Sequence, residues 1–205
     1  MSNNNPSNSK EAGKMGKGLK TALIVVGVLL FFGAWLVSWG FGRYNSVIAM
    51  DEGVKAQWAQ VENQLKRRYD LIPNLVETVK GFAAHEKEIF TAIAEARTKY
   101  FAAQSVGDKV AASRGLEGAL SRLLMLQENY PQLKANENFL KLQDSLEGTE
   151  NRIAVERMRY NDQVRALNAF VRGFPGRIFA GIAGVQQAVY YDLPSGQEET
   201  PQVKF

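Results

Sequence analysis

The sequence predicts an all-α protein with an N-terminal transmembrane helix, an elongated antiparallel four-helix bundle and a short extra C-terminal helix. Three observations support this prediction. One long segment near the N-terminus carries no charged residue, apolar residues recur at spacings of three and four from residue 44 onward, and no segment shows the strict alternation of a half-buried strand. The chain has 205 residues, enough for one domain of moderate size beside the membrane segment.

The uncharged segment covers residues 21–42 and has the sequence TALIVVGVLLFFGAWLVSWGFG. About 20 apolar residues are needed for a helix to cross the hydrocarbon core of a bilayer, so this segment is long enough. Trp35 and Trp39 lie near its C-terminal end, where indole rings favour the membrane interface. A cleaved signal peptide is the alternative, but its apolar region is only roughly 7–15 residues long and ends at a small-residue cleavage site. We therefore expect a permanent anchor.

The flanks of this segment predict its direction in the membrane. Four lysines precede it and one arginine follows it: Lys10, Lys14, Lys17, Lys20 and Arg43. Because positively charged flanks stay on the cytoplasmic side, the N-terminus is predicted to be cytoplasmic and the main domain to lie outside the cytoplasm, in the periplasm of a Gram-negative cell. Residues 1–20 are polar and rich in Gly, Asn and Ser, which predicts a disordered cytoplasmic tail.

The net charge of +4 belongs to the membrane flanks. Residues 44–205 contain 20 basic and 20 acidic side chains, because 5 of the 25 basic and 1 of the 21 acidic residues lie before them. A nucleic-acid-binding domain of this size should have a basic excess, so nucleic acid is not an expected partner. The chain has no cysteine and one histidine, His85, which excludes thiolate and multi-histidine metal sites and Cys nucleophiles.

Four apolar stripes at helical spacing predict the helices of a bundle domain over residues 44–183. Short connections between amphipathic helices favour an antiparallel arrangement. Residues 174–188 are predicted to contain one more short helix, and residues 190–205 form a polar C-terminal tail. The four stripes, in chain order, cover residues 47–68, 72–100, 110–126 and 139–170.

Capping and turn residues predict where these helices begin and end. Asp70 can cap a helix and Pro73 fits its first turn, which would separate the first two helices. Alternatively, the two helices run on through Pro73 with a kink. Residues 104–108, QSVGD, predict a turn before the third helix with Asp108 as its cap, and Asn136 is the predicted cap of the fourth.

Two sequence blocks carry a resemblance to a known family. Residues 58–86 read WAQVENQLKRRYDLIPNLVETVKGFAAHE, and residues 128–168 read ENYPQLKANENFLKLQDSLEGTENRIAVERMRYNDQVRALN; Phe174-Pro175 and the closing PQVKF follow. These blocks resemble the LemA family of bacterial membrane-anchored proteins, over nearly the whole chain from Thr21. The resemblance implies one span and a helical bundle in the inner membrane of a bacterium. It implies no enzymatic activity, cofactor or substrate.

Motifs for catalysis or metal binding are incomplete. His85-Glu86 begins like the zinc-protease string His-Glu-x-x-His, but position 89 is Ile89, so the second imidazole is missing. No Gly-x-Ser-x-Gly elbow occurs, and no glycine-rich loop follows a predicted strand. We therefore predict no catalytic, cofactor-binding or metal-binding residue, and no enzyme. Lys66, Arg67 and Arg68 are basic enough to bind anionic lipid, although neighbouring acidic residues favour ordinary pairing on a helix surface.

Polar residues interrupt two of the apolar stripes. Thr149, Glu156 and Gln163 are spaced by seven on the fourth, and Asp51 and Arg68 lie on the first. They are interpreted either as a ligand groove or as a hydrogen-bonded layer that fixes helix register. The second interpretation is favoured, because a buried charge persists only when it is paired.

These observations predict a membrane-anchored scaffold or adaptor of the cell envelope that acts by protein–protein interaction or self-association. One alternative is an envelope sensor that binds a small molecule between bundle helices near the polar residues. Another is a hydrolase that uses paired carboxylates, such as Asp51 with Glu156. The sequence names neither the protein partner nor a ligand.

Overall fold

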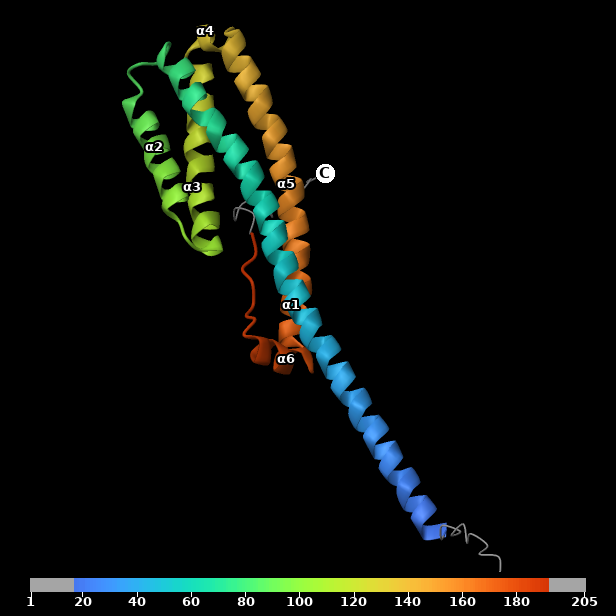
Figure 1. Cartoon of the computed structure of the whole chain (residues 1–205). Coiled ribbons are helices and arrows are strands. Elements are labelled where there is room, and N and C mark those ends of the chain that lie inside the picture. The colour runs from blue at the N-terminus through green and yellow to red at the C-terminus, as the bar shows by residue number, and fades with distance from the viewer. Residues whose placement is uncertain (1–16, 192–205) are drawn as a thin grey trace, which may run out of the picture. The chain divides into compact units, whose positions relative to one another are not determined.

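A computed structural model describes residues 17–191, and this range contains helices and no strand. The all-α prediction is confirmed for these residues, whereas most of both predicted tails lies outside them. The chain divides into two compact units, Met1–Asn45 and Ser46–Phe205. The helices are α1 Lys17–Lys80, α2 Lys87–Ala102, α3 Val106–Met125, a 3-10 helix Leu126–Glu128, α4 Pro131–Lys134, α5 Glu137–Arg172 and α6 Gly176–Ala183 (Figure 1).

The first unit contains the apolar N-terminal part of α1. It supplies the one candidate membrane span found among the described residues, and none of its most apolar window is buried by protein. Exposed Leu, Ile, Val and Phe side chains along a helix of this length are typical of a segment whose solvent is lipid. At its end, the Arg43 guanidinium lies 5.7 Å from the centre of the Trp39 ring, a pairing suited to the membrane interface.

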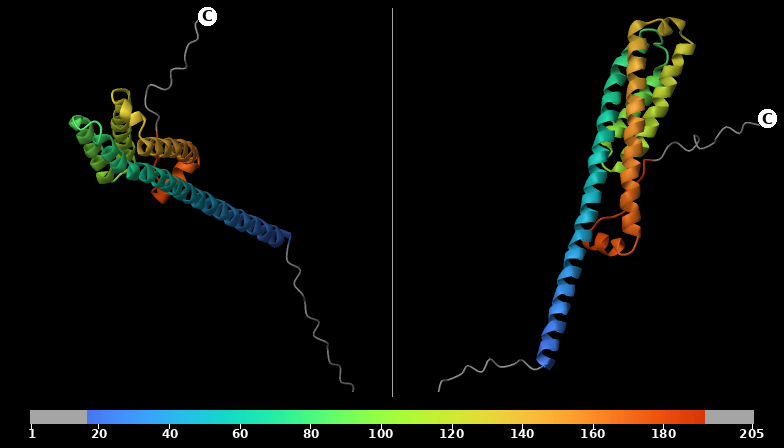
Figure 2. Two further views of the ribbon diagram at one scale, coloured as in Figure 1. Left: turned by 90° about the horizontal axis from the view of Figure 1, so that it is seen from above. Right: turned by 90° about the vertical axis from the view of Figure 1, so that its right-hand side faces the viewer.

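The second unit packs the later part of α1 against α5 in an antiparallel pair (Figure 2). The Trp58 and Tyr160 rings meet edge to face with centroids 5.4 Å apart, and Arg68 forms an ion pair with Glu150. Residue numbers therefore rise along α1 as they fall along α5. Helices α2 and α3 pack against each other, and Tyr69 of α1 meets Tyr100 of α2 with ring centroids 4.6 Å apart. The predicted four helices thus share one core.

The core consists of the apolar stripes that the sequence predicts. From Val47 onward, buried side chains recur along α1 and α5 at spacings of three, four or seven, as one packed face of a helix requires. The buried apolar residues of these two helices are Val47, Val54, Trp58, Val61, Leu65, Tyr69, Ile72, Leu75, Val79, Phe139, Leu146, Ile153, Tyr160, Val164 and Leu167.

The first helix does not end near Pro73, and the kinked alternative is closer to the structure. Helix α1 continues through Pro73 to Lys80, and the break falls at residues 81–86. A proline inside a helix costs about 3 kcal/mol, but Ile72, Leu75 and Val79 are buried on either side of it, and their burial offsets this cost. The second predicted stripe is therefore divided between the end of α1 and α2.

Three smaller boundary predictions have different outcomes. Asn136 caps α5 as predicted, with its side chain accepting the Phe139 N–H at 3.0 Å. The cap of α3 is Ser105 rather than Asp108: the Ser105 hydroxyl oxygen accepts the Asp108 N–H at 3.0 Å. Helix α6 is shorter than the predicted 174–188, because Gly184 adopts the left-handed conformation (φ 70°) that ends a helix.

Truncating Trp58 should destabilise the second unit. Trp58 is buried and contacts the rings of Tyr160 and Tyr191, so Trp58→Ala should cost about 3–5 kcal/mol of unfolding free energy. Urea unfolding of the full chain in detergent, followed by circular dichroism, measures this loss. Arg67 is exposed on the same helix, and Arg67→Ala should cost well under about 1 kcal/mol. A Trp58 variant of full stability would contradict the helical register.

Candidate functional site

The second unit contains a cluster of four charged side chains between its helices. Arg157 of α5 is only 8% exposed. Its guanidinium donates a hydrogen bond to Glu117 of α3 and lies 4.0 Å from a carboxylate oxygen of Glu150. Arg68 of α1 donates to the other oxygen of Glu150. Two cations and two carboxylates therefore connect α1, α3 and α5 without net charge. We call these four residues the charged cluster.

The electrostatics of the charged cluster follow from its burial. Burial raises the pKa of Glu117 above its usual range, and the nearby Arg157 and Arg68 only partly oppose this shift. Burial lowers the pKa of Arg157, but the nearby Tyr191, Glu117 and Glu150 raise it by more than burial lowers it. The pKa is therefore raised overall, and the guanidinium stays charged. Each charge is thus stable in the interior only because its partners are present.

Residues 185–191 leave α6 and run back along α5, and we call them the C-terminal strap. Its last residue, Tyr191, is buried. The Arg157 guanidinium lies 4.4 Å from the centre of the Tyr191 ring, a cation–π contact. The hydroxyl oxygens of Tyr191 and Ser113 of α3 lie 2.7 Å apart in a hydrogen bond. The strap therefore completes the surroundings of the charged cluster.

Two asparagines of α5 hold the backbone of the strap. Asn161 donates to the Tyr191 carbonyl at 2.9 Å and accepts the Tyr191 N–H at 2.8 Å. Asn168 does the same with the carbonyl and N–H of Ala188, at 2.9 and 2.8 Å. The Tyr160 hydroxyl donates to the Val189 carbonyl at 2.8 Å. These side chains form hydrogen bonds with backbone groups of the strap that would pair with a neighbouring strand if the segment lay in a sheet.

The predicted polar stripe of α5 connects helices only in part. Glu156 accepts a hydrogen bond from the Gln57 amide of α1 at 2.6 Å, so it does connect two helices. Thr149 donates to the Leu146 carbonyl of its own helix. Gln163 is exposed, so a spacing of seven does not place all three residues at the same depth.

The other predicted residues have separate partners. Asp51 forms an ion pair with Lys55 at 2.7 Å, and Gln57, the partner of Glu156, lies six residues, about 9 Å, further along α1. The two carboxylates are therefore held in different pairings. Arg68 turns inward to the charged cluster, whereas Lys66 and Arg67 are exposed.

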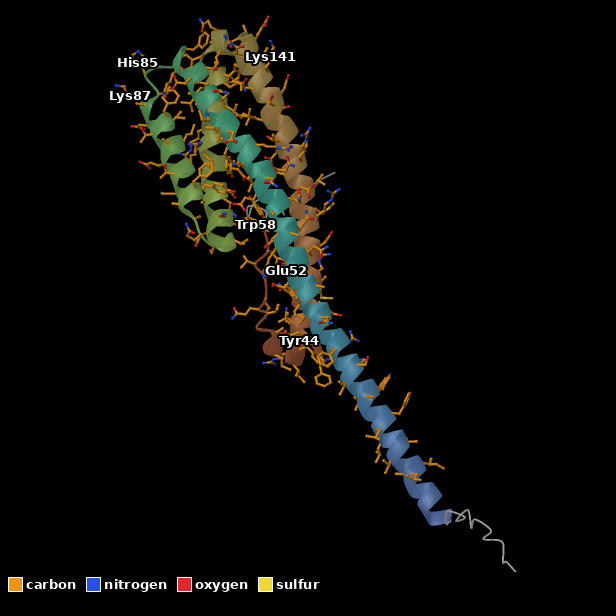
Figure 3. All side chains as sticks on the ribbon, in the orientation of Figure 1. Tyr44, Glu52, Trp58, His85, Lys87 and Lys141 are labelled. Atoms are coloured by element: carbon orange, nitrogen blue, oxygen red, sulfur yellow. The ribbon has the colours of Figure 1, made fainter. Side chains whose placement is uncertain are left out.

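His85 lies in the α1–α2 connection rather than within a helix, and it is exposed (Figure 3). Its neighbour Glu86 accepts a hydrogen bond from the Tyr130 hydroxyl at 3.1 Å. The described residues contain no group of three or more His, Cys, Asp or Glu side chains arranged to hold a metal ion.

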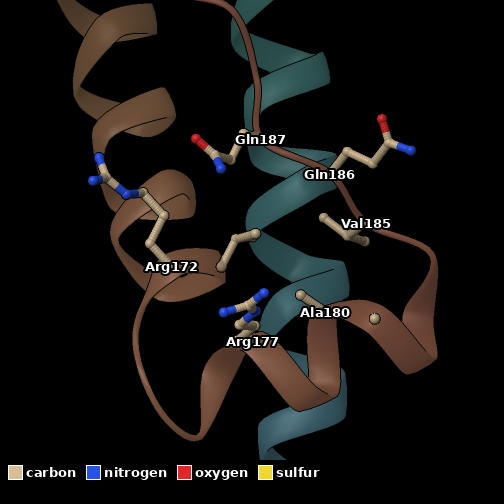
Figure 4. Close-up of a pocket in the computed structure, with 8 residues that line it drawn as sticks. Arg172, Arg177, Ala180, Val185, Gln186 and Gln187 are labelled. Carbon is tan, nitrogen blue, oxygen red and sulfur yellow. The ribbon is translucent and has the colours of Figure 1, made fainter.

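Among the described residues, three surface hollows of the second unit can be compared, and none of these three is lined by the charged cluster. The largest of these three, about 580 Å³, lies where α5, α6 and the strap meet (Figure 4). The second, about 500 Å³, lies between small residues of α2 and α3, and the third, about 350 Å³, lies between α1 and α2 beside Pro73.

Sequence reasoning found Arg68 but missed Arg157, Glu117 and the two asparagines. One available signal was the spacing of seven between Asn161 and Asn168, because residues seven apart lie on the same face of a helix. Arg157 lies on the buried stripe one turn before Tyr160 and immediately after Glu156, which also indicates an interior pairing.

Fold and site together define a helical protein with one candidate membrane span and a bundle closed by internal ion pairs. Residues 57–205 match the LemA family, and the chain belongs to this family. It is 28% identical to magnetosome proteins MamQ 1 and MamQ 2 of Paramagnetospirillum magneticum, over 93% of this chain and 80% of theirs. It is 27% identical to magnetosome protein MamQ of Magnetospirillum gryphiswaldense, over the same shares.

Removing Arg157 should break the charged cluster. Arg157→Met leaves Glu117 buried without its nearest cation, so the expected loss of unfolding free energy is about 3 kcal/mol or more. The matched control is Arg159→Met, because Arg159 pairs with Glu156 on the same helix but is 60% exposed, and it should lose less than about 1 kcal/mol. Equal losses in urea unfolding would show that the cluster does not stabilise the bundle.

Two buried tyrosines differ in whether the hydroxyl group has a hydrogen-bond partner among the described residues. Tyr160→Phe removes the bond to the Val189 carbonyl and should cost about 0.5–1.5 kcal/mol. The Tyr69 hydroxyl is equally buried but has no hydrogen-bond partner among the described residues, so Tyr69→Phe should be neutral or stabilising. Thermal unfolding of both variants measures the difference. A larger loss for Tyr69→Phe would contradict it and indicate a bound polar molecule.

Proposed function

We propose that this protein is a membrane-anchored scaffold or adaptor of the bacterial cell envelope, acting through protein–protein contacts or self-association and without catalysis. The observation that carries the proposal is the charged cluster. Its ionisable groups are paired with one another across helices, which makes them a means of fixing the bundle rather than groups free to react. A rigid bundle on a single anchor presents its outer helix faces to partners.

We also propose in which membrane the protein lies and in which direction it crosses that membrane. The protein is a single-pass component of the inner membrane, with its N-terminus in the cytoplasm and its bundle in the periplasm. The four lysines before residues 21–42, against the single Arg43 after them, support this direction. The magnetosome relatives support a role at a bacterial membrane, since three proteins of that name align with nearly the whole chain.

Photocrosslinking in intact cells tests the scaffold proposal. Benzoylphenylalanine placed at exposed positions on three helices, Phe101 of α2, Met125 of α3 and Met158 of α5, should yield products larger than the monomer from at least one position. Mass spectrometry of these products distinguishes a second copy from another protein. Unirradiated cells are the control. Monomer alone from all three positions would contradict a scaffold.

A C-terminal reporter on the same chain tests the direction separately. Alkaline phosphatase should be active there and a fluorescent protein dark. The opposite pair would reverse the direction but leave the crosslinking result to decide the scaffold.

A ligand sensor is the second candidate, and one observation favours it. The hydroxyls of Tyr69 and Tyr100 are buried in the bundle without a hydrogen-bond partner among the described residues. A small polar molecule would satisfy them. Thermal-shift measurements with envelope metabolites, on the unaltered chain and on Tyr69→Phe, distinguish the sensor: a shift that disappears in the variant supports it. The hydrolase alternative has weaker support, because Asp51 and Glu156 form separate pairings.

A further inference from the structure

Helix α6 shows an inverted distribution of large and small side chains. The face buried against the bundle carries Gly176 and Ala180. The face turned outward carries Ile178 and Ile182, which are 53% and 68% exposed and lie one turn apart, and Phe174 just before the helix is 88% exposed. A surface helix in water normally buries its large apolar residues and exposes its polar ones. These three residues form what we call the α6 apolar face.

The position of α6 in the second unit follows from the register of α1 and α5. Glu156 contacts Gln57, and a Cβ added to Gly53 would lie 3.3 Å from the Gln163 amide oxygen. Continued by seven residues, this antiparallel register brings Ser46, the first residue of the second unit, opposite Phe170, close to the end of α5 at Arg172. Helix α6 therefore lies at the end of the bundle where the chain enters it.

The same end must lie close to the membrane that holds the anchor. Residues 21–42 form the uncharged segment, and Ser46 follows its last residue by four positions, which span at most about 14 Å of fully extended chain. This limit is covalent, so it holds for any placement of the two units. The headgroup layer adds several ångströms to each side of the hydrocarbon core. An apolar face at this end is within reach of that layer.

The charges beside α6 fit a lipid surface. The hollow of about 580 Å³ next to the helix has Arg172, Arg177, Gln186 and Gln187 among its lining residues (Figure 4). The described residues that line it include no Asp or Glu. Arginine guanidinium groups bind phosphate oxygens through paired hydrogen bonds. Apolar residues next to arginines are the pattern of a helix that lies in a membrane interface.

We propose that α6 is a second membrane contact: its apolar face inserts among lipid headgroups, while Arg172 and Arg177 bind the phosphates of anionic lipids. The proposal rests on the membrane anchoring in the proposed function and adds a lipid-binding site to it. A second copy of this chain is the other occupant that an apolar face permits. The covalent closeness of the anchor and the arginine-lined hollow favour lipid.

Depth-dependent quenching tests the proposal on the full chain, which has no native cysteine. Ile182→Cys is labelled with an environment-sensitive fluorophore and placed in vesicles that contain bromine-substituted phosphatidylcholine and phosphatidylglycerol. The matched control is Met158→Cys on α5, which is 60% exposed but lies away from the end of the bundle. The label at position 182 should be quenched at least about twofold more than the label at position 158.

A second arm tests the arginines. Omitting phosphatidylglycerol should reduce quenching at position 182 in the otherwise unaltered chain, whereas a chain with Arg172→Gln and Arg177→Gln should no longer respond to it. Added inorganic phosphate should leave the quenching unchanged, because the apolar face also holds the helix in the membrane. Unchanged circular dichroism shows that the variants fold.

The remaining outcomes overturn the proposal in distinguishable ways. Equal quenching at the two positions means that α6 does not enter the interface. Self-quenching of the label at position 182 that rises with the protein-to-lipid ratio, without bromine quenching, assigns the face to a second copy. In both cases the protein still floats with the vesicles. Failure to float contradicts the membrane anchor itself, and with it the proposed function.

Discussion

The second unit depends on the pairing of Arg157. This guanidinium lies between α3 and α5 with too little exposure to keep its water, so it requires Glu117, Glu150 and the ring of Tyr191 around it. A shift of either helix by one turn, about 5.4 Å, would separate these partners and leave charges buried alone. Apolar stripes tolerate small slips along a helix, whereas a buried charge does not. The charged cluster therefore specifies one register.

The C-terminal strap extends this constraint to α6. Tyr191 contacts Arg157 of α5 and Ser113 of α3, and the Asn168 amide holds Ala188, so the middle and the last residue of the strap are both fixed to α5. Helix α6 lies between α5 and this strap in the chain, and it packs on α5. Its glycine and alanine allow close approach, which leaves the isoleucines on the outside. The exposed apolar face is thus a consequence of how the strap is anchored.

The sequence predicted the features that depend on local periodicity. The uncharged segment and the buried stripes could be recognised because spacing alone determines which side chains share a face. Of the two alternatives predicted at Pro73, the break between helices was wrong and the continuous helix is closer, since burial of Leu75 and Val79 outweighs the local preference of proline. The Arg157–Glu117 pair joins residues 40 apart, and the asparagines bind backbone of a distant segment. Such partners are determined by tertiary packing, which single-sequence patterns do not contain.

The two ends of the bundle differ in a way that bears on function. At the end away from α6, the Tyr130 hydroxyl binds Glu86, and exposed polar residues lie there, His85 in the α1–α2 connection and Lys87 at the start of α2. At the end where the chain enters the bundle, α6 exposes large apolar residues beside two arginines. Such an exposed apolar surface lowers solubility unless another molecule covers it. In the proposed arrangement, a span and an interfacial helix contact one membrane, and two such contacts restrict the tilt of a bundle more than one contact does. The proposed scaffold, which would hold partners at a defined height above the membrane, depends on that restriction.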